Sequence, residues 1–580
     1  MSSTLPPSGP PAGEPEYLDS GSGRPIVPEP AAAGGGGLKK GLLVGGGVVG
    51  LAVVGVGAWA AVSFFATGPQ PAEALPAGTL AYLSVDLDPS GGQKIEALKT
   101  LNKFPAFEDE VGIDTDDDIR KAVFDMVQDE VDCDGLDYED AVEPWLGDRA
   151  AVAAVDAGGD QPDPVVVIQV KDADRAEDGL AAIRKCGGED LGWSIDGDWA
   201  VLAETEKIAK TVSDDAAKAS LADDEDFQRW TDEAGDSGVV AMYAGPALGD
   251  YLAEHADDLF AFPFAMMSGG MAMECVASSD DSLDGSVEEC NPMDPDAPEG
   301  ESMVSEEMKQ AFEDFGGMAG VIRFDDGAVE VEFASDAGTA AGASLLGVTG
   351  LAADGDAGAD TVSTLPDDTA VAIGVGFAEG WFRNVLESYA PYLGGGEDLD
   401  SLVDDIETET GLTLPDDIET LFGDSAALAI GSDVDPESFL GSGDGSDIPI
   451  ALKVDGDPDE IEAVLEKLRA QFPESDTIVF DSDSEGDTVV IGPNEDYRKK
   501  VLKDGDLGGN DVFEDVVREA DDASVVFFVN VNEIEKTIAD AMGEDGDDEF
   551  LENIKPISGF GISGWLDDDV SHSVMRLTTD

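Results

Sequence analysis

The chain has few basic residues and very little histidine. Lysine and arginine together number 31, against 128 aspartate and glutamate residues, and there are 2 histidines. The formal charge of −97 repels nucleic-acid phosphates and anionic lipid, and no basic patch with interleaved aromatics occurs. We therefore expect no nucleic-acid partner. The acid excess favours a solvated surface suited to a salty medium, with a sink for divalent cations as the alternative.

Catalytic motifs are also absent from the sequence. There is no GxSxG, P-loop or HExxH pattern, and no nucleophile with a base nearby. Because 128 carboxylates contain every spacing, the acid pair of a glycosidase stays open, but no particular pair indicates one. We expect no cofactor and no enzymatic activity, and hold a carboxylate-based hydrolase as a distant alternative.

Charge is missing altogether over residues 41–66, a run longer than the about 20 residues that cross a bilayer as a helix. Lys39 and Lys40 precede this run and the next basic residue is Lys94, so the positive-inside rule places residues 1–40 in the cytoplasm and the rest outside. A cleaved signal peptide is the rival, but its apolar region is shorter and lies closer to the N-terminus. We expect a single-pass protein of a bacterial plasma membrane.

The segments around this expected transmembrane helix are of simple composition. Residues 1–40 are rich in Pro, Gly and Ser, which predicts a disordered tail, and residues 67–74 form a linker. Within the helix, small residues recur at spacings of four, which could let two such helices associate; they are Gly41, Gly45, Gly46 and Gly50.

One phrase occurs twice: LGDRAAVAA at 146–154 and FGDSAALAI at 422–430. Other pairs follow in unchanged order, including LPAGTLAYLSVDLD at 75–88 with LPDDTAVAIGVGFA at 365–378. This indicates two copies of one domain, at 75–338 and 365–580, joined by a Gly/Ala/Asp-rich linker at 339–364. Clustered hairpin signals with helices between them predict an α+β fold: two tandem copies with mainly antiparallel sheet and packed helices, preceded by the single transmembrane helix.

Local patterns locate several elements. Residues 80–85 alternate as a strand does, and 165–170 form a nearly continuous β-branched run. Ile461, Val464, Leu465 and Leu468 fall on one face of a helix that begins after Asp457. The sequences FDDG at 324–327 and LDDD at 566–569 predict hairpin turns.

The four cysteines all lie in the first copy, on the expected outer side. An even number in an oxidising compartment favours disulfides. We favour Cys133 with Cys186 and Cys275 with Cys290. A zinc site is the alternative, although CxxC spacing is missing.

The first copy also contains an insert at about 259–301, whose beginning, LFAFPFAMMSGGMAMEC, is the most apolar part of the outer chain. Its thioethers could bind Cu(I), but a flexible apolar flap over the core or over a ligand is favoured. The flap residues are Phe262, Phe264, Met266, Met267, Met271 and Met273.

One acidic run matches half of a calcium loop. Asp481, Asp483 and Glu485 occupy ligand spacings, but Gly492 stands where the bidentate glutamate belongs. A polar hairpin turn is therefore favoured, and we assign no metal site.

The stretch LPAGTLAYLSVDLDPSGGQKIEALKTLNKFP, at 75–105, resembles the opening of an actinobacterial membrane-protein family known as domain of unknown function 3352. We expect the resemblance to run over most of 75–580, and it implies location and organisation but no site residue. We expect a non-enzymatic cell-envelope module that binds or displays a partner. The alternative is a carrier of an apolar, lipid-like ligand, with residues 259–275 as its lid.

Overall fold

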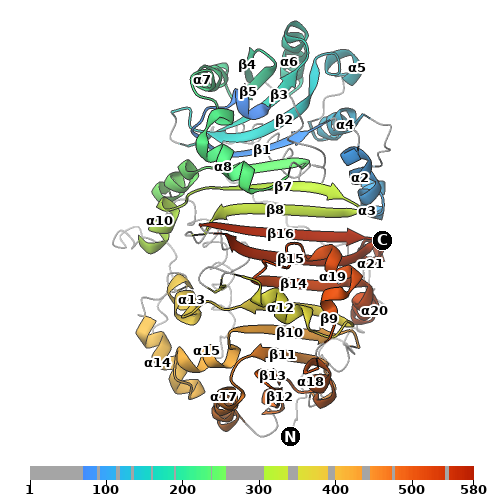
Figure 1. Cartoon of the computed structure of the whole chain (residues 1–580). Helices are drawn as coiled ribbons and strands as arrows, with labels where there is room; N and C mark the ends of the chain where they lie inside the picture. Colours follow the sequence, from blue (N-terminus) through green and yellow to red (C-terminus); the bar gives the residue numbers. More distant parts are fainter. Residues whose placement is uncertain are drawn as a thin grey trace, which may run out of the picture.

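The computed structural model describes most of the chain beyond residue 69. It covers residues 70–580 apart from 88–91, 111, 113–117, 132–135, 159–160, 188–190, 237, 256–305, 338–350, 354, 390–398, 434–444, 473–476, 504, 543–547 and 568. Within these residues, the strands form one 16-stranded sheet in which every neighbouring pair is antiparallel (Figure 1).

Each half of the sheet contains eight strands. The first half consists of β1 (Thr79–Asp86), β2 (Leu146–Val155), β3 (Asp163–Val170), β4 (Gly192–Asp196), β5 (Trp199–Ala203), β6 (Val240–Ala244), β7 (Met318–Asp325) and β8 (Ala328–Asp336). The second consists of β9 (Thr369–Gly376), β10 (Ser425–Gly431), β11 (Ile450–Asp455), β12 (Ser482–Glu485), β13 (Thr488–Ile491), β14 (Val525–Asn530), β15 (Ile557–Asp567) and β16 (Val570–Thr579). From its outer edge to the junction, each half has the same strand order. It is β4-β5-β3-β2-β1-β6-β7-β8 in the first half and β12-β13-β11-β10-β9-β14-β15-β16 in the second.

Helices connect the strands in both halves. In the first half they are η1 (Pro71–Ala74), α2 (Gly92–Leu101), α3 (Pro105–Glu110), α4 (Ile119–Val131), α5 (Tyr138–Ala141), α6 (Ala173–Gly187), α7 (Glu206–Ala216), η2 (Leu221–Asp223), α8 (Glu225–Glu233) and α10 (Glu306–Glu313). In the second they are α12 (Ala357–Ser363), α13 (Trp381–Tyr389), α14 (Leu399–Thr410), α15 (Asp416–Phe422), α17 (Pro458–Gln471), η5 (Thr477–Phe480), α18 (Glu495–Val501), η6 (Leu507–Gly509), α19 (Asp511–Val516), α20 (Val531–Met542) and α21 (Asp548–Ile554).

The halves are joined by backbone pairing of their last strands, β8 and β16. The register runs without a break from Val570 opposite Asp336 to Thr578 opposite Ala328. The expected fold, two tandem copies of one domain with mainly antiparallel sheet and packed helices behind a transmembrane helix, is therefore wrong, because the strands of both copies form one continuous sheet. The physical reason is that the last strand of each half would otherwise be an open edge with unpaired N–H and C=O groups, and pairing the two edges satisfies both.

The expected transmembrane helix is not part of the observed architecture either. Among the described residues, no helix has the length and apolar character needed to cross a membrane. Residues 41–66, for which that helix was expected, lie outside the described part of the chain.

The predictions of individual helices and turns are more accurate than the prediction of how these elements assemble. Helix α17 begins after Asp457, whose side chain accepts hydrogen bonds from the backbone N–H groups of Asp459 and Glu460, and its four predicted face residues are all buried. The hairpin β7–β8 turns through Asp326 and Gly327, whose φ angles are 47° and 82°, a left-handed conformation that a tight two-residue turn requires. The expected helix and hairpins are thus confirmed.

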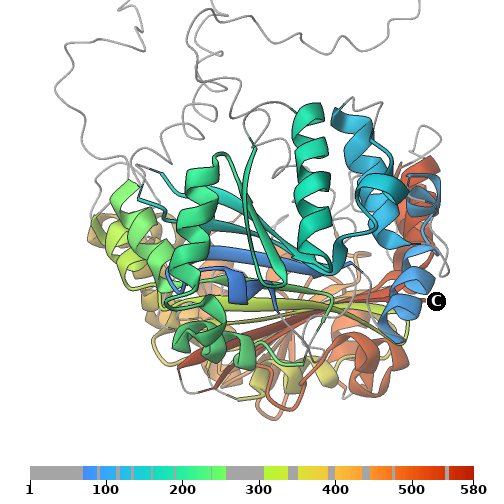
Figure 2. The same ribbon diagram turned by 90° about the horizontal axis from the view of Figure 1, so that it is seen from above.

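Both faces of the sheet carry apolar clusters. On what we call the first face, one cluster surrounds Trp230 in the first half and another surrounds Phe528 in the second. On the opposite, second face, separate clusters lie under α6, under α2 and under α17. The view from above shows helices on both sides of the sheet, with α8 (green) on one side and α6 (teal) on the other (Figure 2).

Candidate functional site

The central strands carry an ionic ladder on the first face. Glu330 of β8 lies directly opposite Arg323 of β7 and directly opposite Arg576 of β16. Its carboxylate accepts hydrogen bonds from Arg323 Nε at 2.6 Å and from Arg576 Nη1 at 2.5 Å. The ladder therefore ties three adjacent strands together and crosses the junction between the halves.

The ladder is buried, which sets its electrostatics. Glu330 and Arg576 are only 5% and 6% exposed. Burial works to raise the pKa of Glu330, but the two arginines outweigh it and the pKa lies below its ordinary value. For Glu332, two residues along β8, burial prevails over the hydrogen bond from Arg323, and the pKa is raised. Charge is thus enclosed on this face of the central strands.

The second face of the same strands is apolar. The register places one apolar side chain of each of seven adjacent strands directly opposite the next, from β10 to β7. We call this set the central row. It consists of Leu428, Ile373, Phe527, Ile562, Met575, Val331 and Ile322.

The central row remains partly open to solvent. Ile373 is 39% exposed, and the other six side chains are half-buried. A parallel row beside it is also apolar and half-buried; it contains Ile430, Val371, Val529, Phe560, Leu577 and Val329. The central strands thus reverse the usual arrangement, because charge is enclosed on one face and apolar side chains meet water on the other.

Buried clusters continue the central row at both ends. Beyond Leu428 the register leads through Leu452 to Ile491, within the cluster under α17. At the other end, Ile322 itself packs against the cluster under α2, to which Val240 opposite it belongs. The accessible part is therefore a bounded stretch in the middle of the sheet.

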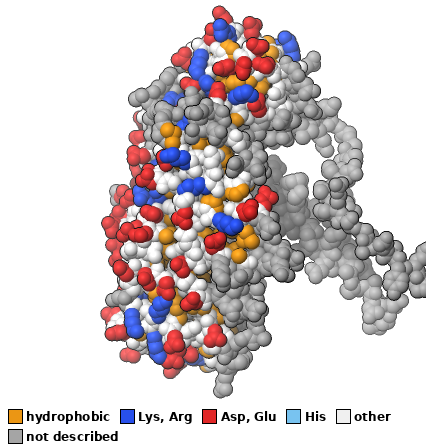
Figure 3. Space-filling view, turned by 90° about the vertical axis from the view of Figure 1, so that its right-hand side faces the viewer, with side chains coloured by type: hydrophobic (Ala, Val, Ile, Leu, Met, Phe, Trp, Pro, Cys, Tyr) orange, Lys and Arg blue, Asp and Glu red, His pale blue; other side chains and the backbone are white. Residues whose placement is uncertain are grey.

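The surface facing the viewer in Figure 3 shows abundant Asp and Glu side chains with Lys and Arg among them.

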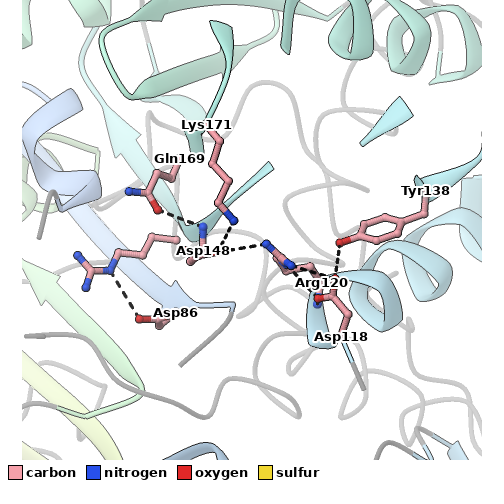
Figure 4. Close-up of polar contacts among 8 residues, drawn as sticks. Asp86, Asp118, Arg120, Tyr138, Asp148, Gln169 and Lys171 are labelled. Carbon is pink, nitrogen blue, oxygen red and sulfur yellow. Dashed lines mark hydrogen bonds and ion pairs between the residues drawn. The ribbon is translucent and has the colours of Figure 1, made fainter. Parts of the chain in front are cut away.

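A second candidate site is a polar cluster near the first residues of β2, in the first half (Figure 4). The carboxylate of Asp118, just before α4, accepts hydrogen bonds from Arg120 Nε at 2.9 Å, from Arg120 Nη2 at 3.0 Å and from the Tyr138 hydroxyl at 3.0 Å. The carboxylate of Asp148 accepts hydrogen bonds from Arg120 Nη1 at 3.1 Å and from Lys171 Nζ at 2.8 Å. The cluster thereby fixes α4 to the ends of β2 and β3.

Charge compensation dominates this cluster. Partial burial works to raise the pKa of Asp118, but hydrogen bonds from Arg120 and Tyr138 lower it overall. The pKa of Tyr138 is raised, first by burial and then by its bond to the carboxylate of Asp118. The carboxylate of Asp118 is held ionised by the guanidinium of Arg120 beside it, and this arrangement suits a structural ion pair better than proton transfer.

A buried ion pair next to this cluster distinguishes the two halves. Asp86 of β1 lies opposite Arg149 of β2, with Oδ2 and Nε 3.6 Å apart. The second half has Gly376 opposite Ser425 at the matching place. There a Cβ on Gly376 would lie 2.8 Å from Cβ of Ala357, so the glycine lets α12 pack closely on the sheet. The ionic arrangement is therefore particular to the first half.

The sequence-based cysteine and flap predictions mostly fall outside the described residues. Cys133, Cys275 and Cys290 lie there, as do residues 259–275 with all six flap side chains, Lys39, Lys40 and the four glycines from 41 to 50. Cys186 lies in α6. No disulfide occurs among the residues that the structure describes, so the expected pairing stays a prediction.

The acidic run near residue 481 forms part of a hairpin edge. Asp483 and Glu485 lie in β12, and Asp483 is held by Arg498 Nε at 3.0 Å. Within the described ranges, no three His, Cys, Asp or Glu side chains come together in a way that could hold a metal ion. The favoured hairpin is confirmed by the pairing of β12 with β13.

Sequence reasoning missed the central row and both ionic clusters. Each row residue is an ordinary strand residue, and only the pairing of seven strands brings them into line. The repeated GD phrase was the available signal for the polar cluster, since it contains Asp148.

The fold and site together define a single-sheet, two-half antiparallel protein with helices on both faces and a partly exposed apolar row at its centre. Residues 43–193 match the family described as "Protein of unknown function (DUF3352)". This stretch contains β1 to β3 and the whole polar cluster around Asp148, but not the strands that form the central row. No curated protein and no solved structure matches the chain. The resemblance to domain of unknown function 3352 is therefore confirmed for this stretch. Its actinobacterial and membrane aspects, and its extension through both halves, stay predictions.

Proposed function

We propose that the chain is a non-enzymatic binding module of the cell envelope that holds an apolar ligand on the central row. The observation that carries the proposal is the exposure of this row. Seven apolar side chains on adjacent strands reach solvent in a protein whose net charge is −97. Apolar surface left in water costs about 25 cal/mol per Å², and contiguous apolar patches commonly mark binding sites.

The ionic ladder supports this proposal from the other side of the sheet. Glu330 and Arg576 alternate along their strands with the row residues Val331 and Met575, and strand alternation sends the two kinds of side chain to opposite faces. Cross-strand ion pairing holds β7, β8 and β16 in register. The row therefore has a rigid support that does not depend on a ligand.

The uncharged residues 41–66 and the preceding Lys39 and Lys40 support attachment to a membrane, with the sheet outside the cytoplasm. A location next to the membrane would give the module direct access to apolar molecules.

The test is binding of an environment-sensitive apolar dye to the full chain in detergent-free solution. Ile373→Asp places a charge at the most exposed position of the row, and we expect the affinity for the dye to fall at least about tenfold. Val479→Asp is the matched control, because Val479 is 47% exposed but belongs to η5 near the outer edge of the second half. Equal loss in both variants, or no dye binding by the unmodified chain, would contradict the proposal.

A further inference from the structure

Resting on the proposed function, we infer that the ligand of the central row is a long, uncharged aliphatic chain that lies across the strands. The row provides three properties that select for such a molecule: its straightness, its chemistry and the charge around it.

The row is straight because each of its residues lies directly opposite the next. Met575 is opposite both Ile562 and Val331, and Phe527 is opposite both Ile373 and Ile562. Seven strands give six spacings of about 4.8 Å, so the row is roughly 29 Å long. That length is close to the about 30 Å hydrocarbon thickness of a whole bilayer, and about twice what the chains of one leaflet span. A molecule that fills the row is therefore longer than one leaflet's chains.

The chemistry of the row suits saturated hydrocarbon. Six of the seven side chains are aliphatic or thioether, and the seventh is Phe527. None of them can donate or accept a strong hydrogen bond. An extended peptide would place its backbone N–H and C=O groups on this surface without partners, which costs free energy for every group that is desolvated. A hydrocarbon chain brings no such groups.

Charge selects the end group. The chain carries 128 acidic residues against 31 basic ones, and its summed field repels an anion approaching the sheet. A carboxylate or phosphate at the end of the aliphatic chain therefore weakens binding, whereas a hydroxyl does not.

The experiment is displacement of the bound dye from the full chain by straight-chain primary alcohols of increasing length, each below its aggregation concentration. We expect the affinity to rise about fourfold for each added CH₂, and to level off only when the chain is longer than one leaflet's chains. At one fixed length, the carboxylate should bind more weakly than the alcohol, and the difference should shrink at high salt.

A polar substitution in the middle of the row tests the geometry. Met575→Gln keeps the side-chain length but divides the row, so the affinity should level off at a shorter chain than in the unmodified protein. Val479→Gln, outside the row, should leave the length dependence unchanged. Circular dichroism checks the fold of each variant, and Leu428→Gln, at the end of the row, is a second variant with a smaller expected shortening.

The outcomes separate this inference from the proposed function. If Ile373→Asp abolishes dye binding but alcohols of any length fail to displace the dye, apolar binding stands and the aliphatic ligand is wrong. Displacement by an apolar helical peptide instead would identify a protein partner and overturn the inference. If the dye does not bind the unmodified chain, the proposed function itself fails.

Discussion

Glu233 and His572 meet across the junction between the two halves: Glu233 Oε2 of α8 lies 3.9 Å from His572 Nε2 of β16. The imidazole is stacked on Trp565, with ring centroids 5.2 Å apart and planes inclined by 9°. Nearby, Arg229 of the same helix binds Asp569 at 2.9 Å. Helix α8 of the first half thus contacts the β15–β16 hairpin of the second half. These side-chain contacts add to the backbone pairing of β8 and β16.

The burial of His572 makes stability depend on pH. Burial lowers the pKa of His572 below 6.5, although Glu233 and Asp567 oppose the shift. The unfolded chain therefore binds a proton at higher pH than the folded chain. The stability contribution is present above 6.5 and is lost as pH falls from there through the folded pKa. We expect His572→Gln to flatten this part of the pH dependence of the free energy of unfolding, measured with denaturant.

The second histidine provides the control. His255 Nδ1 lies 3.0 Å from the carbonyl oxygen of Tyr251, four residues earlier in the chain, and His255→Gln should leave the pH dependence due to His572 in place. Asp163 and Asp360 have raised pKa values and act in the opposite direction, but they are present in every variant and cancel in the difference. An unchanged pH dependence in His572→Gln would contradict the assignment.

The ionic ladder should be a major source of junction stability. Glu330→Gln keeps the shape of the side chain but leaves Arg323 and Arg576 without their shared buried carboxylate. Breaking a buried pair costs about 3–5 kcal/mol, and we expect that loss in the free energy of unfolding.

A partner at the surface of the same ladder provides the comparison. Asp325 lies 3.6 Å from Arg576 and its side chain is 59% exposed, so Asp325→Asn should cost at most about 1 kcal/mol. Equal effects of the two substitutions would show that the enclosed carboxylate has no special role.

The sequence predicted the elements more successfully than their assembly. The alternation in β1, the buried face of α17 and the β7–β8 turn depend on neighbours along the chain, and periodicity reports them. The pairing of Glu330 with Arg576 joins residues far apart in the sequence. A pattern along one strand cannot show that the last strands of the two halves, β8 and β16, pair with each other. Asp118 accepts a hydrogen bond from the backbone N–H of Arg120 at 3.0 Å, which is a local contact, whereas its hydrogen bond from the Tyr138 hydroxyl joins separate segments and appears only in the structure.

The polar cluster should show the pH dependence of a carboxylate whose pKa is lowered. The ionised form of Asp118 stabilises the folded chain above the ordinary pKa of 3.8, and this contribution is lost as pH falls through the lower folded value. Asp118→Asn should therefore cost about 1–3 kcal/mol of unfolding free energy at neutral pH, and less in acid. A cost that does not decrease in acid would show that the charge of Asp118 is unimportant.

Pairing of β8 with β16 also predicts how the protein unfolds. Because one sheet contains both halves, tryptophans of the first half (Trp145, Trp230) and of the second (Trp381, Trp565) should report one coincident denaturant transition. Two separate transitions, as expected of independent domains, would contradict the continuous sheet. Single-tryptophan variants measured by fluorescence provide the test.

The most direct measurement of the central claim is photo-crosslinking with a long-chain aliphatic diazirine, followed by peptide mapping by mass spectrometry. We expect label to concentrate on Val525–Asn530, Ile557–Asp567 and Val570–Thr579, which contain Phe527, Ile562 and Met575 of the central row. An excess of unlabelled alcohol should remove it. Label confined to other segments, or spread evenly over the surface, would contradict the central row as the ligand site.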